Sequence, residues 1–91
     1  MAVKSKKTAA LKEICSDIEI NISKCNATVI FFDLDILSRK KLIQNMPDSV
    51  QKQIHLLMID CYSEKRGLLE RGLMSLKHNR ATLKKEIKRL S

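Results

Sequence analysis

Cysteine, histidine and aspartate side chains are the groups in this chain that could perform catalysis or hold a metal ion. A zinc site needs clustered ligands, but the three cysteines lie 10 and 36 residues apart along the chain. Neither His55 nor His78 completes a recognised metal-ligand spacing. Asp33 and Asp35 form a close pair of carboxylates, with no third catalytic group beside them. The sequence therefore predicts a protein that is not an enzyme and needs no metal or other cofactor.

The cysteines fit better as small apolar side chains. Cys15, Cys25 and Cys61 each fall within an apolar periodic pattern, where a free thiol packs like a small hydrophobic group. Three thiols cannot all pair within one chain. We therefore expect all three to be reduced and shielded from solvent.

Basic side chains near the C-terminus are a second kind of candidate site. The cluster consists of Lys77, Arg80, Lys84, Lys85, Lys88 and Arg89. Glu86 is the only acid among the last sixteen residues, so the cluster has few acidic partners nearby in the sequence. Such a cluster is typical of a solvated helix face, whose cations suit the negative end of the helix dipole. It is also suited to binding an acidic partner, and both interpretations stay open.

Composition indicates one small helical domain. The 91 residues carry a net charge of +8, and hydrophobic residues make up 44%, which is typical of a chain that folds. Aromatic residues are only 3%, and 2 glycines and 1 proline are too few for the turns of a many-stranded fold. The N-terminus lacks the apolar region of a secretory signal, and no apolar run is long enough to span a membrane. We expect an all-α protein that is cytoplasmic and not bound to membranes.

Apolar spacing predicts the first long helix. Between residues 11 and 36, apolar side chains recur in alternating steps of four and three, which is the spacing of a coiled-coil seam. The eight seam positions are Leu11, Cys15, Ile18, Ile22, Cys25, Val29, Phe32 and Ile36. The pattern predicts a helix over residues 8–37, after a basic, flexible segment at residues 1–7. A strand at residues 28–37 is the alternative, which would need a second copy of the chain as its pairing partner.

Capping signals predict two further helices. Ser38 can cap a short helix over residues 38–46, and Pro47 lies just beyond its end. Asp48 begins a pattern that resembles a capping box, which places the start of a long basic helix at residue 49 and its end at residue 90.

The apolar seam of this long helix is interrupted. Its positions are Val50, Ile54, Leu57 and Cys61, and then Leu69, Leu73, Leu76, Arg80, Leu83, Ile87 and Leu90. The jump from Cys61 to Leu69 predicts a stutter in the coiled coil, without requiring the helix to end. A break or bend at Gly67 is the alternative.

These elements predict two long antiparallel helices with coiled-coil-like seams, joined by the short capped helix. The first helix would be shorter than the last one, so about ten residues at the C-terminus would have no intrachain neighbour. Leu83 and Ile87 would then leave an apolar stripe in water, which is typical of a binding surface or an oligomer seam. A bend that folds this end back onto the core is the alternative.

Arg80 interrupts that stripe at a seam position between Leu76 and Leu83. A guanidinium there must reach solvent along its aliphatic stem or meet a carboxylate, because an unpaired buried charge is costly. The carboxylate could come from another chain, in which case Arg80 would specify the partner.

The expected activity is therefore binding through protein–protein interaction, as in a regulator, inhibitor, adaptor or chaperone. The expected partner is a protein with an acidic surface or a second copy of the chain. The candidate binding residues are Arg80, Leu83, Lys84, Lys85, Ile87, Lys88, Arg89, Phe31, Leu34 and Leu37.

Nonspecific binding to a nucleic-acid backbone is the alternative function, since lysine and arginine at helical spacing can follow phosphates. A ribbon-helix-helix DNA reader would place a strand at residues 29–36 and helices at residues 38–46 and 48–66. Asp33 and Asp35 argue against it, because they put carboxylates where such a ribbon needs donors for the major groove.

Overall fold

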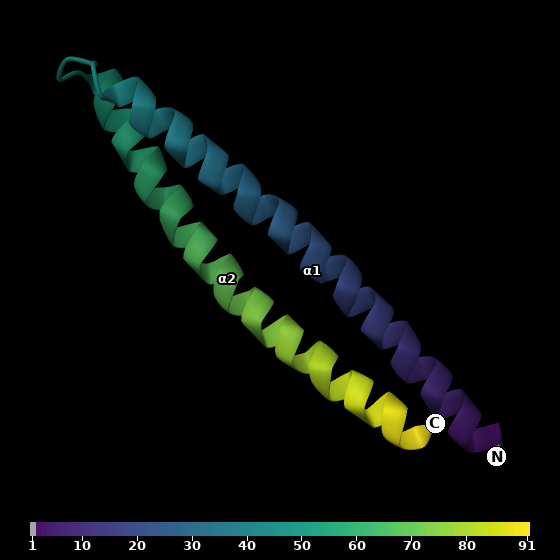
Figure 1. Ribbon diagram of the computed structural model, residues 1–91. Coiled ribbons are helices and arrows are strands. Elements are labelled where there is room, and N and C mark those ends of the chain that lie inside the picture. The colour runs from purple at the N-terminus through teal and green to yellow at the C-terminus, as the bar shows by residue number, and fades with distance from the viewer. Residues whose placement is uncertain (1) are drawn as a thin grey trace.

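The chain forms a hairpin of two long helices (Figure 1). The computed structural model describes the backbone of residues 2–91 and the side chains of residues 6–91. Helix α1 spans Ala2–Ile43 and helix α2 spans Val50–Leu90, with a loop over residues 44–49 between them. The molecule measures 71 × 15 × 15 Å, and its two ends lie together at the pole opposite the loop (Figure 1). The predicted all-α class and the pair of long antiparallel helices are confirmed.

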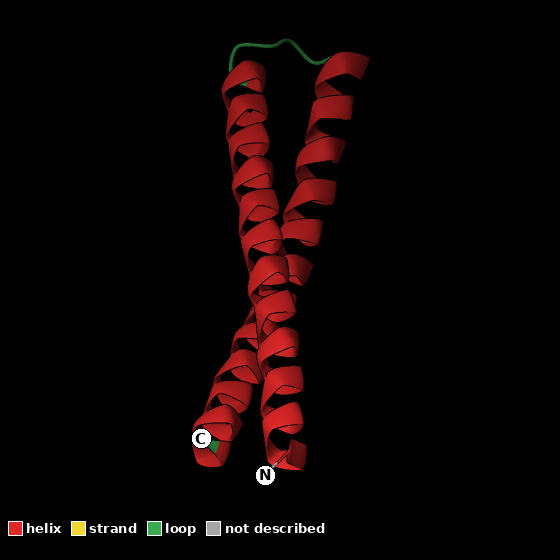
Figure 2. Ribbon diagram, turned by 90° about the vertical axis from the view of Figure 1, so that its right-hand side faces the viewer, coloured by secondary structure: helices red, strands yellow, loops and turns green. Residues whose placement is uncertain are grey.

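Helix α1 follows the predicted seam. All eight seam positions between Leu11 and Ile36 are buried or half-buried, and Cys15, Ile22 and Ile36 are among the most buried side chains of the chain. The same alternation of steps continues through Arg39 and Ile43, which are half-buried as well. The helices cross in projection in Figure 2, as expected when a seam repeats every 3.5 residues and the helix has 3.6 residues per turn.

The predicted boundaries of the first helix are wrong at both ends. Helix α1 continues through residues 38–43, so no separate short helix exists within the part of the chain that the structure describes. Ser38 could cap a helix, but the seam continues past it, and packing against α2 outweighs a local capping preference. At the other end, residues 2–7 belong to α1; Met1 and the side chains of residues 2–5, part of the expected flexible segment, lie outside the described part.

The start of α2 lies one residue beyond the prediction. Ser49 is the N-cap, with extended backbone angles (φ −162°, ψ 168°), and its side-chain oxygen accepts a hydrogen bond from the backbone N–H of Lys52 at 3.2 Å. Asp48 is not the cap; its carboxylate pairs with the Lys52 ammonium at 3.4 Å. The predicted end at Leu90 is confirmed.

Helix α2 keeps one uninterrupted seam, so the predicted stutter is wrong. The buried and half-buried positions that alternate in steps of three and four are Lys52, His55, Ile59, Tyr62, Arg66, Leu69, Leu73, Leu76, Arg80, Leu83, Ile87 and Leu90. The helix is continuous through Gly67, which excludes the alternative of a break there. Val50, Ile54, Leu57 and Cys61, which the sequence assigned to the seam, are all exposed on the outer side of the helix.

The helices match in length, so the predicted overhang at the C-terminus is also wrong. Helix α1 has 42 residues and α2 has 41. Leu83 and Ile87 are half-buried, because α1 begins earlier and ends later than predicted and so runs beside this end of α2. The structure therefore has neither the uncovered apolar stripe at the C-terminal end of α2 nor the bend that was its alternative.

The core of this hairpin is thin. The buried apolar side chains are Cys15, Ile22, Ile36, Ile59 and Leu73. None of the large side chains that the structure describes is fully removed from solvent. All three cysteines are free, but only Cys15 is buried, whereas Cys25 is half-buried and Cys61 is exposed. The expectation of three shielded thiols is therefore wrong for Cys61, because it lies on the outer side of α2 and not in the seam.

Candidate functional site

The hairpin divides into two halves with different charge. The loop half, residues 28–68, has six basic and five acidic residues, a net charge of +1. The terminal half, which comprises the rest of both helices, has the remaining twelve basic and five acidic residues, a net charge of +7. Any attraction of an acidic partner therefore comes from the terminal half.

Polar and aromatic side chains fill the seam of the loop half. Arg39 on α1 pairs with Asp35 one turn earlier at 2.8 Å, and its Nη1 donates to the Nδ1 of His55 on α2 at 2.8 Å. The guanidinium also lies 5.8 Å from the ring centre of Tyr62. Since Arg39 can only donate, the Nδ1 atom of His55 must carry no proton in this arrangement. Tyr62 stacks in turn on Phe32, with the ring centres 5.2 Å apart.

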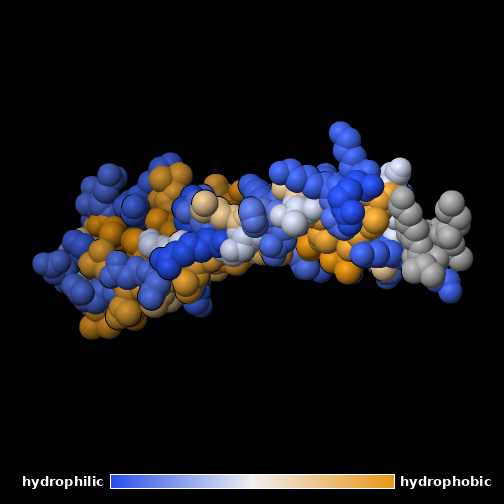
Figure 3. Space-filling view, turned by 90° about the horizontal axis from the view of Figure 1, so that it is seen from below, coloured by the Kyte–Doolittle hydropathy of each residue, from blue (hydrophilic) through white to orange (hydrophobic). Residues whose placement is uncertain are grey.

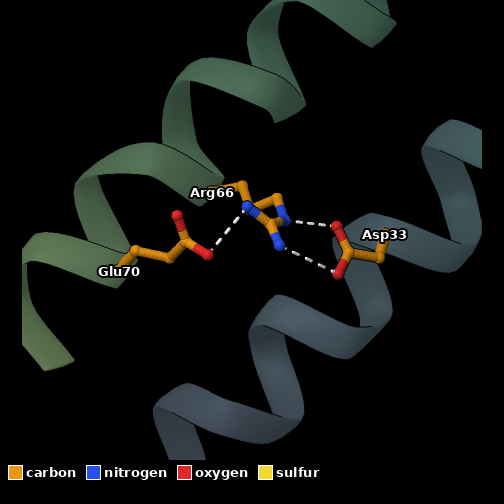
Figure 4. Close-up of polar contacts among 3 residues, drawn as sticks. All are labelled: Asp33, Arg66 and Glu70. Atoms are coloured by element: carbon orange, nitrogen blue, oxygen red, sulfur yellow. Dashed lines mark hydrogen bonds and ion pairs between the residues drawn. The ribbon is translucent and has the colours of Figure 1, made fainter.

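Arg66 provides a second polar link across the seam (Figure 4). Its guanidinium donates to both carboxylate oxygens of Asp33 on α1 and pairs with Glu70 on its own helix at 2.9 Å. The hydrogen bond to Asp33 is the main cause that raises the pKa of Arg66 above its ordinary value. This contact joins the helices, but its side chains are one-third to one-half exposed, so it adds little to stability.

An apolar patch lies on the outer side of α1 in the loop half. We call Ile30, Phe31, Leu34 and Leu37 the α1 outer patch; between 50% and 62% of each residue is exposed. The sequence predicts Phe31, Leu34 and Leu37 as binding residues, and the structure places all three at the surface. Figure 3 shows apolar side chains at the surface toward the loop end, at the left of that view.

A second apolar surface lies on the outer side of α2. We call Val50, Ile54, Leu57, Cys61 and Leu68 the α2 outer stripe, and all five are exposed. Sequence reasoning did not identify this stripe as a surface. One feature of the sequence indicates it, namely the irregular step of eight residues from Cys61 to Leu69. If the regular steps of the C-terminal seam are instead continued towards the N-terminus, they pass through Arg66, Tyr62 and Ile59, and no irregular step occurs.

The basic candidates lie in the terminal half. Lys84 is exposed and pairs with Glu19 on α1 at 3.2 Å, while Lys85 and Lys88 are exposed. Exposed lysines at the start of α1 lie at the same end of the hairpin, and they include Lys6, Lys7 and Lys12. The basic candidates are thus at one pole and the α1 outer patch is near the other, so the predicted binding residues do not form one site.

Two further basic candidates differ in their surroundings. Arg89 is exposed and bonds Glu86, which lowers the pKa of Glu86 below 4.5; the charge of Lys7 on α1 contributes further. Arg80 is half-buried at its predicted seam position. Among the side chains that the structure describes, no carboxylate lies within ion-pair distance of Arg80, so within the chain it fits the solvent-reaching arrangement.

A shallow depression lies where the two halves meet. Its volume is about 380 Å³, and its lining is Asn26, Val29, Glu70, Leu73, Met74 and Lys77. The lining contains no histidine, cysteine or serine. Among the described residues, no three histidine, cysteine, aspartate or glutamate side chains come together as metal ligands. Neither helix has a described segment both long and apolar enough to cross a bilayer.

Comparison with known proteins gives no relative. No protein-family model, no curated protein and no solved structure matches the chain significantly. The function must therefore be argued from the surfaces of the hairpin.

Proposed function

We propose that this chain is a non-catalytic helical binding protein that recognises a protein partner through the α1 outer patch. The observation that supports the proposal is the exposure of Phe31, Leu34 and Leu37 side by side on one helix, at 62%, 60% and 50%. Clustered large apolar side chains in water are characteristic of interaction sites, and aromatic residues are enriched at the centres of interfaces. A regulator, inhibitor, adaptor or chaperone could work in this way.

The charge of the terminal half supports an acidic partner. With a net charge of +7, this half attracts an acidic protein over a distance and speeds the first encounter, while the near-neutral α1 outer patch supplies the close contact. Three free thiols fit a reducing compartment such as the cytoplasm.

Affinity capture with a matched pair of variants tests the proposal. Leu34→Asp puts a charge in the patch, whereas Ile20→Asp changes a residue of similar exposure (51%) fourteen residues earlier, on the same face of α1. The tagged proteins are incubated with extract of the source cells, treated with nuclease. We expect the wild type and Ile20→Asp to retain the same bound protein and Leu34→Asp to lose it. Equal retention by Leu34→Asp would remove the patch from the binding site.

Binding to a nucleic-acid backbone is the second candidate function. It is favoured by the exposed lysines that α1 and α2 bring to the same pole, which include Lys7, Lys12, Lys85 and Lys88. Affinity for duplex DNA should then fall steeply and linearly with salt on a double-logarithmic plot. It should also fall when Lys85 and Lys88 are replaced by glutamine, and Leu34→Asp should leave it unchanged. Absence of binding at low salt would exclude this function.

A further inference from the structure

The α2 outer stripe has the spacing of a second coiled-coil seam. Its first four residues, Val50 to Cys61, follow steps of four, three and four, and Leu68 comes one heptad after Cys61. The stripe faces away from α1, since all of its residues are exposed while the alternating seam of α2 is covered. Side chains at this spacing interlock with those of another helix.

The charge of the loop half suits contact with an identical surface. Two loop halves, each with a net charge of +1, can meet with little repulsion, whereas two terminal halves at +7 repel each other. A parallel pair would place the terminal halves together and Glu64, within the stripe, beside Glu64 of the copy. An antiparallel pair separates the two basic terminal halves and also separates the two Glu64 side chains.

The antiparallel arrangement also matches apolar residues. If the two-fold axis passes near the level of Ile59, Val50 faces Leu68 of the copy and Leu57 faces Cys61, while Ile54 faces Glu64. A two-fold axis makes both contacts occur twice, so one stripe supplies both sides of the interface.

The surface area of the chain leaves room for such a contact. The hairpin exposes 6967 Å², whereas a compact folded monomer of this mass exposes about 5,400 Å². The excess of about 1,600 Å² is larger than the roughly 800 Å² that each partner contributes to an interface of standard size. A second polypeptide can therefore cover the α2 outer stripe while the α1 outer patch stays exposed.

We propose that a second copy of this chain covers the α2 outer stripe, with the two α2 helices antiparallel over their loop halves. Ile59 lies 32 residues from Ser91, which at 1.5 Å per residue is about 48 Å, so the pair would be about 100 Å long. The two basic terminal halves lie at opposite poles of this pair. The inference is independent of the proposed function, because the α1 outer patch lies on the other helix.

Mass in solution tests the pairing. By light scattering or sedimentation equilibrium, the wild type should have twice the 10.4 kDa chain mass. Leu57→Asp should halve this mass, and Met74→Asp should not, although Met74 is an even more exposed apolar residue of α2 in the terminal half (72% against 63%). Circular dichroism verifies that each variant keeps its helices. A wild type that stays at 10.4 kDa at high concentration, or a pair that survives Leu57→Asp, would overturn the proposal.

The Cys61 thiol reports on the same surface without any substitution. It is the one exposed thiol of the three, and pairing covers it with Leu57 of the copy. Its reaction with a water-soluble thiol reagent should slow as the protein concentration rises, and it should be fast at all concentrations in Leu57→Asp. A rate independent of concentration in the wild type would contradict the pairing, even if a partner protein still binds the α1 outer patch.

X-ray scattering in solution tests the orientation. A single copy or a parallel pair has a longest dimension near 71 Å, whereas the antiparallel pair should approach about 100 Å by the helix rise. A pair no longer than one copy would exclude the antiparallel arrangement.

Discussion

The two halves of this hairpin differ in the side chains that fill the seam between the helices. In the terminal half, the seam is mostly aliphatic apart from Arg80, with residues such as Ile22 and Leu73 buried between the helices and lysines on the outside. In the loop half, much of the seam consists of Arg39, His55 and Arg66, while apolar side chains such as Leu57 face solvent. A regular heptad spacing can therefore position two helices without ensuring that the apolar residues lie between them.

This difference has energetic consequences for the single chain. Burial of aliphatic area is the main stabilising contribution in the terminal half. The loop half buries only Ile36 and Ile59 and otherwise relies on partly exposed ion pairs and one aromatic stack, and such ion pairs contribute little. The exposed surfaces of the loop half gain most from being covered by another polypeptide, which is why both proposed interfaces lie there.

The largest expected effect contrasts two leucines of α2. Leu73→Ala should lower the free energy of unfolding by about 2–4 kcal/mol, because it leaves a cavity in the terminal half where Leu73 is only 6% exposed. Leu57→Ala should cost less than about 1 kcal/mol when measured on the single chain, because its side chain is already in water. Urea unfolding at low protein concentration measures both. Comparable losses would contradict the assignment of Leu57 to the outer side.

The same substitution at two seam arginines should have effects of opposite sign. Arg80→Leu should raise the free energy of unfolding by about 1 kcal/mol, since a half-buried side chain with no carboxylate in reach is replaced by an aliphatic one. Arg39→Leu should lower it by about 1 kcal/mol, since Asp35 and His55 lose their partner. Thermal unfolding compares the two variants, and a rise for both would show that the polar contacts of Arg39 add nothing to stability.

The seam of α1 could be predicted because each of its eight positions is apolar and none is missing. The seam of α2 could not, because two stripes in its first half have heptad spacing and the more apolar one lies outside. Hydrophobicity alone favours the register of Val50, Ile54 and Leu57 over that of Lys52, His55 and Ile59. The structure keeps the register that continues from the terminal half, since a shift of register would interrupt the packing against α1.

Errors at the helix ends led to the errors about the binding surface. A cap at Ser38 predicts a first helix that is too short, which leaves Leu83 and Ile87 without a neighbour. Local capping signals compete with packing along the whole seam, and only the structure shows which one prevails. The α1 outer patch did not depend on these boundaries, because Phe31, Leu34 and Leu37 lie off the seam in either case.

Two glycines allow the halves to be compared within one helix. Both lie inside α2, Gly67 in the loop half and Gly72 in the terminal half, and an added Cβ would meet no atom within 4 Å at either position. Each replacement by alanine should raise the free energy of unfolding by about 0.5–1 kcal/mol, because alanine has the higher helix propensity. Thermal unfolding and helical circular dichroism measure the gain. A smaller gain for Gly67→Ala would indicate that the loop half opens before the terminal half, and a loss at Gly67 would contradict a continuous helix.

The smallest expected effect tests the charge difference between the halves at Glu86. The hydrogen bond from Arg89 lowers the pKa of Glu86 below 4.5, and Lys7 of α1 adds to the lowering. A carboxylate with a lowered pKa stabilises the fold above its unfolded pKa, and this contribution is lost as the pH falls through the lowered value. Because the Glu86 side chain is still 35% exposed and Arg89 is more exposed, we expect a change in titration and hardly any change in stability. Titration followed by NMR should show the pKa of Glu86 rising toward 4.5 in Arg89→Gln.

High salt should produce a smaller rise in the pKa of Glu86 in the wild type, because it screens the charge of Lys7. Lys7→Gln should reproduce the effect of salt while the Arg89 bond remains. A pKa that responds to neither variant would show that the positive charge of the terminal half does not reach this carboxylate.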